Sequence, residues 1–418
     1  MSKRLNCSIL LGGMLFSTSL WGQAIEPACQ AEHAWKVAWE RFYHPSTHLF
    51  YDYISSYERG KELAHLPTKA EVERQYPNPC GYGTGMEDCA ILTGTMLETL
   101  VDRFSVNPDE RISEQAAAAL RGLASCSLIE EAPGFVARGI CPEDGKSYYI
   151  NSSRDQYTHC VYGLWRYYRS PLAGVGAKDT VRRILLGIAD RMIRNVTPAH
   201  NYDFLRADGE PCPLGICRMW NVQSHEAARL PMFYAAAWDV TGEKRYYDQY
   251  RKYVVEAVRQ SETIGKQHAA YVFVQILYSF DLLLAVEKDS ALREDLAALR
   301  RRVAAMSLER AESSLAKLKT LTKKDLAVLG PDWRLVERWD RQGGYLIPRW
   351  GEYRKTWDLI REVGESTLAV FMAGDVSMRE KALAIQREYL SLFDYDHLSS
   401  CGIIYHVAAY WESLKNEP

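Results

Sequence analysis

The chain has 418 residues, of which 51 are basic and 53 acidic, and its formal net charge is −2. A near-neutral chain without a basic tract has no electrostatic attraction for nucleic acid, so we expect no nucleic-acid partner. After the N-terminal segment, no stretch is both long and uncharged enough to cross a bilayer. We therefore expect no membrane insertion of the mature chain.

Residues 1–24 have the pattern of an export signal. Lys3 and Arg4 precede a mostly apolar run over 9–20, and Gly22-Gln23-Ala24 supplies small residues for cleavage. A retained membrane anchor is the alternative, but it needs about 20 apolar residues and this run is shorter. The pattern predicts a periplasmic or secreted protein.

The cysteines agree with export. The sequence has ten of them, nine after the expected signal, which suits an oxidising compartment. Cys212 and Cys217 are near enough in sequence to form a disulfide, Cys126 and Cys141 could form another, and an odd number leaves one thiol free. Because no C-x-x-C pattern and no nucleotide-binding or phosphate-binding fingerprint occurs, we expect no metal and no cofactor.

Apolar residues recur at helical spacing along nearly the whole chain, and no run alternates polar and apolar residues convincingly. The spacing predicts helices over 30–43, 86–104, 109–128, 153–169, 177–195, 224–241, 243–261, 267–287, 290–325, 365–374, 377–391 and 403–414.

The connections between these helices alternate in length. Short turns fall at 106–109, 241–244 and 373–376, and long loops at 44–85, 129–152, 196–223 and 326–364. Strict alternation places all the long loops at one end of the helical stack, and long loops in compact domains usually carry function. The pattern predicts an all-α fold of about six helical hairpins closed into an (α/α)6 toroid, formed by residues 25–418 as one domain. A superhelical solenoid is the alternative, but its loops would be more uniform.

Acidic residues open the predicted inner helices. They are Glu87 and Asp88, then Asp155, Glu226 and Glu365. The toroid brings these helix starts to one rim. Paired carboxylates there suit glycoside hydrolysis, in which one donates a proton and the other activates water or attacks. We expect Asp88, Asp155 and Glu226 to be catalytic, with Asp88 and Asp155 as the main pair.

The alternative for each acid is helix capping. Acids in a first turn are stabilised by the helix dipole, and Ser153 with Gln156 resembles a capping box. Capping does not explain the polar residues that accompany the acids on otherwise apolar helices. We expect these to line a substrate cleft, and they are Glu87, Arg154, Gln156, His159, Asn221, His225 and Tyr271.

The loop over 326–364 is unusually aromatic. It contains Trp333, Trp339, Tyr345, Trp350, Tyr353 and Trp357, together with Arg349. We expect it to form a sugar-stacking wall in which Arg349 and Trp350 bind substrate. The alternative is that the rings pack onto the toroid.

Three short stretches carry a resemblance to known proteins. Residues 83–88 (Gly-Thr-Gly-Met-Glu-Asp), 152–157 (Ser-Ser-Arg-Asp-Gln-Tyr) and 236–242 (Ala-Ala-Trp-Asp-Val-Thr-Gly) resemble uncharacterised secreted bacterial members of the six-hairpin glycosidase-like superfamily. More distantly, the chain resembles unsaturated glucuronyl hydrolases, which place two aspartates at the starts of inner helices, as Asp88 and Asp155 are placed. The aspartate-histidine surroundings of those hydrolases are missing, so their substrate is not carried over.

The resemblance implies a carbohydrate-active enzyme with a glycan or oligosaccharide substrate, most simply a glycoside hydrolase. A polysaccharide lyase is the runner-up, since several toroid lyases use Asn, Gln or Arg to neutralise a uronate and His or Tyr to remove a proton. Candidates for those roles are Asn221, His225, Arg229 and Tyr234, or His268, Tyr271 and Gln275. A sugar-binding protein without activity is a third possibility. Sugar epimerases also use toroids with paired histidines, but most are cytosolic.

Overall fold

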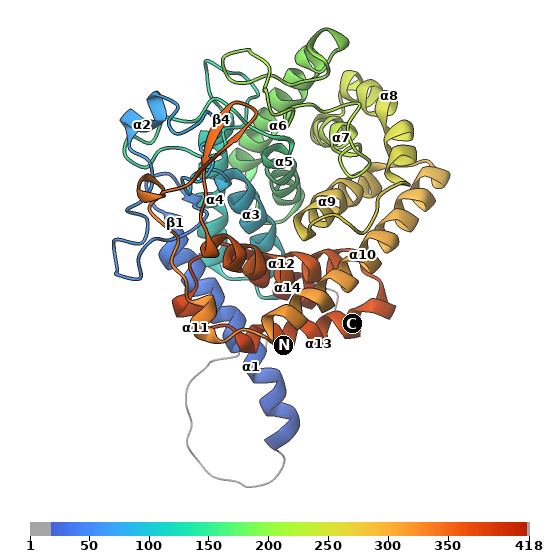
Figure 1. Cartoon of the computed structure of the whole chain (residues 1–418). Helices are drawn as coiled ribbons and strands as arrows, with labels where there is room; N and C mark the ends of the chain where they lie inside the picture. The colour runs from blue at the N-terminus through green and yellow to red at the C-terminus, as the bar shows by residue number, and fades with distance from the viewer. Residues whose placement is uncertain (1–17, 416–418) are drawn as a thin grey trace.

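A computed structural model describes residues 18–415, which form the predicted all-α (α/α)6 toroid (Figure 1). Each inner helix packs against the next one along the chain, and α14 packs against α3, which closes the ring. The inner helices are α3 (Cys89–Val106), α5 (Arg154–Arg169), α7 (Arg229–Thr241), α9 (Ala270–Val286), α12 (Glu352–Met372) and α14 (Ile403–Lys415).

A second layer of helices surrounds this ring (Figure 1). The outer helices are α1 (Thr18–Val37), α4 (Glu110–Ser127), α6 (Val175–Asn195), α8 (Lys244–Ser261), α10 (Ser290–Leu318) and α13 (Val376–Leu392). The shorter helical turns are η1 (Ala38–Phe42), α2 (Lys69–Glu73), η2 (Pro198–His200), α11 (Lys323–Leu326), η3 (Trp333–Leu335) and η4 (Tyr395–His397). Two small antiparallel hairpins pair β1 (Tyr43–His44) with β2 (Leu49–Phe50), and β3 (Trp339–Gln342) with β4 (Tyr345–Pro348).

The two layers differ in sequence pattern because they differ in burial. α9 reads Ala-Tyr-Val-Phe-Val-Gln-Ile-Leu-Tyr-Ser-Phe and is buried on nearly every side. The outer helix α8 buries Tyr246, Tyr250, Val254 and Ala257, which recur at helical spacing, and exposes charged residues between them. A helix that is apolar all round belongs inside, whereas a helix with one apolar stripe covers a core.

Two glycines allow α3 and α5 to approach closely. A Cβ atom on Gly163 would lie 2.3 Å from the carbonyl oxygen of Gly94, and one on Gly94 would lie 2.5 Å from that of His159. Those distances are far below van der Waals contact, and the obstructing atoms belong to the backbone. This glycine contact therefore sets how near the first turns of α3 and α5 lie to each other.

The two ends of the toroid are built differently. All inner helices begin at one end, where the long connections 43–88, 128–153, 196–228 and 319–351 also lie. We call this end the rim. At the opposite end, the base, short turns such as 107–109 and 242–243 join each inner helix to the outer helix that follows. The predicted segregation of long and short connections is present.

Two predicted helix starts require correction, and two short hairpins were not predicted. α12 begins at Glu352 rather than at Glu365, because Tyr353, Trp357 and Ile360 already form its buried stripe. α7 begins at Arg229 rather than at 224, so His225 and Glu226 precede the helix. The hairpins β1–β2 and β3–β4 were also missed, since their strands are only two and four residues long.

The export signal expected at 1–24 lies mostly outside the described residues. Within residues 18–415, no helix has both the length and the apolar composition to cross a membrane. Cys212, Cys217, Cys126 and Cys141 are unbridged, so the expected disulfides are not formed in the structure. Cys212 and Cys217 are nevertheless hydrogen-bonded neighbours, and a disulfide between them in oxidised protein stays a prediction.

Candidate active site at the rim

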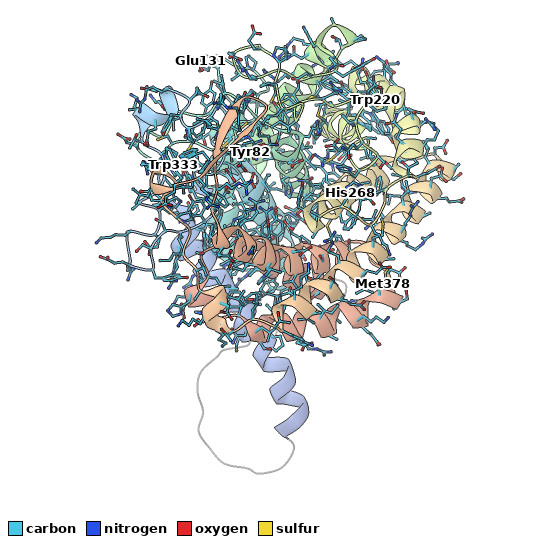
Figure 2. The ribbon with its side chains drawn as sticks, viewed as in Figure 1. Tyr82, Glu131, Trp220, His268, Trp333 and Met378 are labelled. Atoms are coloured by element: carbon cyan, nitrogen blue, oxygen red, sulfur yellow. The ribbon has the colours of Figure 1, made fainter. Side chains whose placement is uncertain are left out.

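The rim gathers charged side chains from the starts of the inner helices and from the loops before them. Figure 2 shows two of the segments involved: Tyr82 and His268 lie over the ring of inner helices, whereas Met378 lies on its outer edge. We call the following residues the rim cluster: Asp52, Glu87, Asp88, Arg138, Arg154, Asp155, Gln156, His225, Glu226, Arg229, His268, Arg361 and Glu365.

Asp88 is held from three directions. Its carboxylate lies 3.7 Å from Nη1 of Arg138 and 3.5 Å from Nη1 of Arg361, and it accepts a 3.1 Å hydrogen bond from Nε2 of Gln156. It is the N-cap residue of α3, yet its side chain makes no capping hydrogen bond. Of its side chain, 18% is exposed. Capping therefore does not explain this acid.

Two more acids lie beside Asp88. Glu87 is buried and accepts a hydrogen bond from the backbone N–H of Gly83. Burial, and then the negative charge of Asp88, raise the pKa of Glu87 to about 7. Asp52 is also buried, and neither of its carboxyl oxygens has a hydrogen-bond partner. Burial and the charges of Asp88 and Glu87 raise the pKa of Asp52 well above its usual value, so this part of the rim holds protons at neutral pH.

Asp155 is the most exposed carboxylate of the rim cluster. It lies in the first turn of α5, 33% of its side chain is exposed, and Arg229 donates a hydrogen bond to it. Burial around the group opposes ionisation, but the charge and hydrogen bond of Arg229 lower the pKa of Asp155 below its usual value. Arg229 also donates a 2.6 Å hydrogen bond to Gln275. Asp155 is thus an oriented, ionised carboxylate at an accessible position.

Arg154 and Glu226 form a second oriented pair. Nε of Arg154 donates to Glu226 over 2.8 Å, and Nη1 donates to the carbonyl oxygens of Gly215 and Arg218 over 2.8 and 2.7 Å. The guanidinium group is therefore occupied by the loop before α7. The predicted role of Arg154 in gripping substrate is replaced by a role in positioning Glu226.

Two histidines meet beside Glu226. The rings of His225 and His268 are 4.2 Å apart, and Nδ1 of His225 is buried without a hydrogen-bond partner. Burial lowers the pKa of His225 to about 4 and also lowers that of His268. Both imidazoles are therefore neutral near pH 7 and able to accept a proton. Tyr271 lies one turn further on and is 40% exposed.

Several predicted substrate-binding residues are not accessible. Gln156 is fully buried and donates to the backbone oxygen of Glu87 as well as to Asp88, so it does not form a capping box with Ser153. His159 is buried and bonds to Thr95 over 2.9 Å, and burial lowers its pKa to about 3. These two side chains are buried beneath the rim. They hold the helix starts in place and do not contact a substrate.

The aromatic segment is largely part of the core. Trp333 is fully buried, and Trp350, Tyr353 and Trp357 are 9%, 3% and 6% exposed. The indole N–H of Trp350 donates to the carbonyl oxygen of Gly83. The expected sugar-stacking wall is therefore wrong for these four rings. Trp350, Tyr353 and Trp357 pack together, and Trp333 packs on Tyr76.

Two other predicted residues lie apart from the rim cluster. Arg349, on the exposed side of the β3–β4 hairpin, forms an ion pair with Asp340. Asn221 is exposed and has a positive φ of 55°, which fits a turn. Neither makes a contact with the clustered acids.

Sequence reasoning missed Asp52, Arg138 and Arg361. Asp52 interrupts the apolar run Leu-Phe-Tyr-Asp-Tyr-Ile, and a lone acid in such a run is a signal that could have marked it. Arg361 precedes Glu365 by four residues on the buried face of α12, and the two are paired at 3.0 Å. Finding Arg361 required the correct start of α12.

The fold was compared with known proteins. No family model matches the sequence, and no curated protein matches it. A sugar epimerase from a ruminal bacterium superposes with a TM-score of 0.52 at 13% identity, covering 92% of this chain and 98% of its own. The cellobiose 2-epimerase of Spirochaeta thermophila gives 0.50 at 13% identity, with 96% and 98% covered. An α-1,6-mannanase variant of a Salegentibacter species, in complex with α-1,6-mannotriose, gives 0.38 at 14% identity, with 67% and 87% covered.

The chain has a six-hairpin (α/α)6 toroid. At such low identity the likeness concerns the fold alone. The fold predicted from hairpin spacing is thereby confirmed, and function has to be argued from the rim.

Proposed function

We propose that the protein is a carbohydrate-active enzyme that hydrolyses glycosidic bonds at the rim. The observation that carries the proposal is a set of carboxyl groups in contrasting environments. Asp88 and Asp155 are held by arginines and are partly exposed, whereas Glu87 beside them has a pKa of about 7. Carboxyl groups whose environments separate their pKa values are what acid–base hydrolysis of an acetal requires.

The environments suggest a division of roles. Asp155 has a lowered pKa and Asp88 lies between two arginines, so either can activate water or stabilise the positive charge that develops on the sugar ring. Glu87 keeps its proton up to about pH 7 and supplies it to the leaving oxygen. Glu226, fixed by Arg154, completes the acidic rim as a hydrogen-bond acceptor for substrate hydroxyls.

The arginines favour hydrolysis over lyase chemistry. A lyase needs a cationic or amide group free to neutralise the uronate carboxylate of its substrate. Arg138 and Arg361 flank Asp88, Arg154 pairs with Glu226, and Arg229 pairs with Asp155. Because each of these four guanidinium groups already has a carboxylate partner, the rim suits a neutral glycan better than a polyuronate.

A sugar epimerase is the second candidate, and the contact between His225 and His268 favours it. Two neutral imidazoles can remove and return a proton next to a sugar carbonyl. Two solved toroids that superpose on this chain, with TM-scores of 0.52 and 0.50, are described as a sugar epimerase and a cellobiose 2-epimerase. Their substrates do not transfer at 13% identity, so this candidate depends on the histidines.

We further propose that the protein is periplasmic or secreted, with residues 25–418 as a single catalytic domain. The support is the basic and apolar pattern before residue 25. N-terminal sequencing of protein recovered from the periplasm or medium should begin near Ile25. Recovery of the full-length chain from the cytosol alone would contradict this location.

One panel of glycans tests the enzymatic proposals together. Purified protein is incubated with neutral and uronate-containing oligosaccharides while reducing ends, ultraviolet absorbance and product sugars are followed. New reducing ends alone indicate a hydrolase, and absorbance of an unsaturated uronate indicates a lyase. An isomerised sugar without new ends indicates an epimerase. Binding without any product would contradict catalysis and leave a sugar-binding protein.

A further inference from the structure

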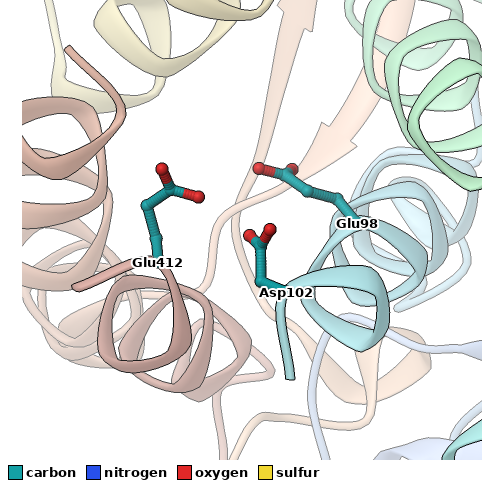
Figure 3. Close-up of side chains that lie close together, drawn as sticks. All are labelled: Glu98, Asp102 and Glu412. Carbon is teal, nitrogen blue, oxygen red and sulfur yellow. The ribbon is translucent and has the colours of Figure 1, made fainter. Parts of the chain in front are cut away.

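A second acidic cluster lies at the base of the toroid, far along the inner helices from the rim. Figure 3 shows Glu98 and Asp102 on α3 pointing toward Glu412 on α14. One carboxylate oxygen from each of the three lies within 4.8 Å of the others. All three side chains are buried, with at most 3% of each residue exposed. We call these three residues the base triad.

The base triad joins the two ends of the ring. α3 is the first inner helix and α14 the last, and their contact closes the toroid. A cation shared by Glu98, Asp102 and Glu412 would therefore bridge segments that are more than three hundred residues apart in sequence. A link of that kind stabilises the closed ring, because it holds α3 and α14 together, and no short connection in the chain joins these two helices.

Positively charged side chains pair with two of the three acids of the triad but not with Glu98. Arg166 pairs with Asp102 at 2.5 Å, and Lys415 lies 2.5 Å from Glu412 and 3.4 Å from Asp102. Glu98 has no ion pair, and neither of its buried oxygens has a hydrogen-bond partner. Burial, and then the charge of Asp102, raise the pKa of Glu98 well above its usual value, because an unpaired charge in a low-dielectric interior is costly.

An independent group faces the same carboxylate. The hydroxyl of Tyr278 on α9 is buried, faces the carboxyl group of Glu98 and makes no well-aligned hydrogen bond. Because Tyr278 belongs to a different helix from the triad, its oxygen is a fourth potential ligand. A cavity of about 430 Å³ adjoins Glu412 and Lys415, which gives an entry path and room for coordinating water.

We propose that the base triad binds one hard divalent cation, with Ca²⁺ as the ion that fits best, and that Lys415 occupies the cation position when the ion is absent. Carboxylate and hydroxyl oxygens are ligands that hard cations prefer, and Ca²⁺ binds them at about 2.3–2.6 Å. Two oxygens on opposite sides of such an ion lie about 4.6–5.2 Å apart, so oxygens within 4.8 Å can share it. Mg²⁺ needs a tighter octahedron at about 2.0–2.1 Å.

Lys415 can leave without unfolding the chain. It is the last residue of α14, and 26% of its side chain is exposed at the cavity. Its ammonium group is the only part that must move, and the stem is long and flexible. Release of Lys415 to solvent frees Glu412 completely and leaves Asp102 with Arg166.

The test uses the full chain after treatment with a chelator. Melting temperature is measured against CaCl₂ and MgCl₂, with NaCl at equal ionic strength as the salt control, and equilibrium dialysis gives the number of Ca²⁺ ions bound. We expect one Ca²⁺ per chain and a rise in melting temperature on the order of 2–5 °C at saturation, with a smaller effect of Mg²⁺.

Three variants distinguish a cation site from a charge network. Glu98→Gln removes one of the three carboxylate ligands and should abolish the Ca²⁺-dependent rise. Lys415→Met removes the competing ammonium group and should lower the half-saturating Ca²⁺ concentration by about tenfold or more, a gain that a purely structural Lys415 does not predict. Glu287→Gln, a buried acid paired with Arg251 and outside the triad, should keep the full response.

Two results would overturn the proposal. One is that neither the wild type nor Lys415→Met responds to 10 mM Ca²⁺ beyond the NaCl control, a concentration that is on the order of ten times the weakest usual Ca²⁺ sites. The other is that the response survives in Glu98→Gln. If Glu98→Gln does not fold, Lys415→Met and the dialysis stoichiometry still decide, since both require only folded protein.

Discussion

The rim and the base of this toroid contain the same kinds of side chain in opposite states of exposure. At the rim, Asp88 and Asp155 are paired with arginines and keep 18% and 33% of their side chains open. At the base, Asp102 is also paired with an arginine but is sealed, and Glu98 is sealed without a partner. The difference teaches that pairing alone does not mark a reaction site. Accessibility separates Asp88 and Asp155, which a substrate can reach, from Glu98 and Asp102, which can meet only a proton or a small ion.

The loops explain the difference. Long connections at the rim leave space above the helix starts and supply Arg138 and Gly83 to the acids there. At the base, turns of a few residues bring neighbouring helices together, and the charged groups are buried among them. Substitutions at the rim should therefore change turnover, and substitutions at the base should change stability.

The largest expected effect is the loss of turnover in Asp155→Asn. Asparagine keeps the shape and can still accept the hydrogen bond from Arg229, but it cannot transfer a proton or carry charge. We expect turnover on a confirmed substrate to fall by about 10²–10⁴-fold. Asp248→Asn, at an exposed position on α8, is the matched control and should be unchanged.

The same variant also measures the structural role of Asp155. A capping residue would cost at most about 1 kcal/mol of unfolding free energy and leave turnover intact. Because Asp155 is the partner of buried Arg229, its neutralisation should lower the melting temperature more than a cap would. Near-wild-type turnover in folded Asp155→Asn would remove it from the catalytic set.

At the base, Arg166→Met should act on stability alone. The substitution leaves Asp102 buried without its main cation, and breaking one side of a buried pair costs about 3–5 kcal/mol of unfolding free energy. Lys244→Met, which breaks the exposed pair with Asp248, should cost less than about 1 kcal/mol. Chemical denaturation measures both. Loss of turnover per folded molecule in Arg166→Met would show that the two ends are coupled.

Between the two ends, Gly163→Ala tests the contact that fixes α3 against α5. An added methyl group would meet the backbone of Gly94 at 2.3 Å, so we expect a loss of about 1–3 kcal/mol from overpacking. Gly176→Ala in α6 has open space around it and should be neutral or slightly stabilising. Equal unfolding free energies of the two variants would mean that α3 and α5 can move apart without loss of stability.

Much of this architecture could be predicted from sequence. Apolar periodicity located the helices, and the alternation of loop lengths located the rim, because both are local properties of the chain. Asp88, Asp155 and Glu226 were found by their place near helix starts. Other contacts join residues far apart in sequence, such as Arg361 with Asp88 and Glu98 with Glu412. No local sequence pattern predicts contacts of this kind. The buried state of Trp350 and His159 is likewise set by tertiary packing.

The last prediction concerns pH. If Glu87 is the general acid, it must be protonated, so activity should fall as pH rises through about 7, by about tenfold per pH unit above that point. Asp155, whose pKa is lowered, stays ionised well into the acidic range and sets no limit near neutrality. The direction follows from the cause, because burial and the charge of Asp88 both favour the protonated form of Glu87.

Two variants separate this catalytic role from simple burial. Glu87→Gln keeps the shape but has no transferable proton, so turnover should drop and the remaining activity should lose its decline above pH 7. Asp88→Asn removes the neighbouring negative charge and should move the midpoint of the decline to lower pH, measured as kcat/KM against pH for whatever activity remains. A decline that persists unchanged in Glu87→Gln would assign the ionisation to another group. Asp52 would then be the next candidate for the general acid, because it is a buried carboxyl group close to Asp88 and Glu87. The pH profile of Asp52→Asn would test it.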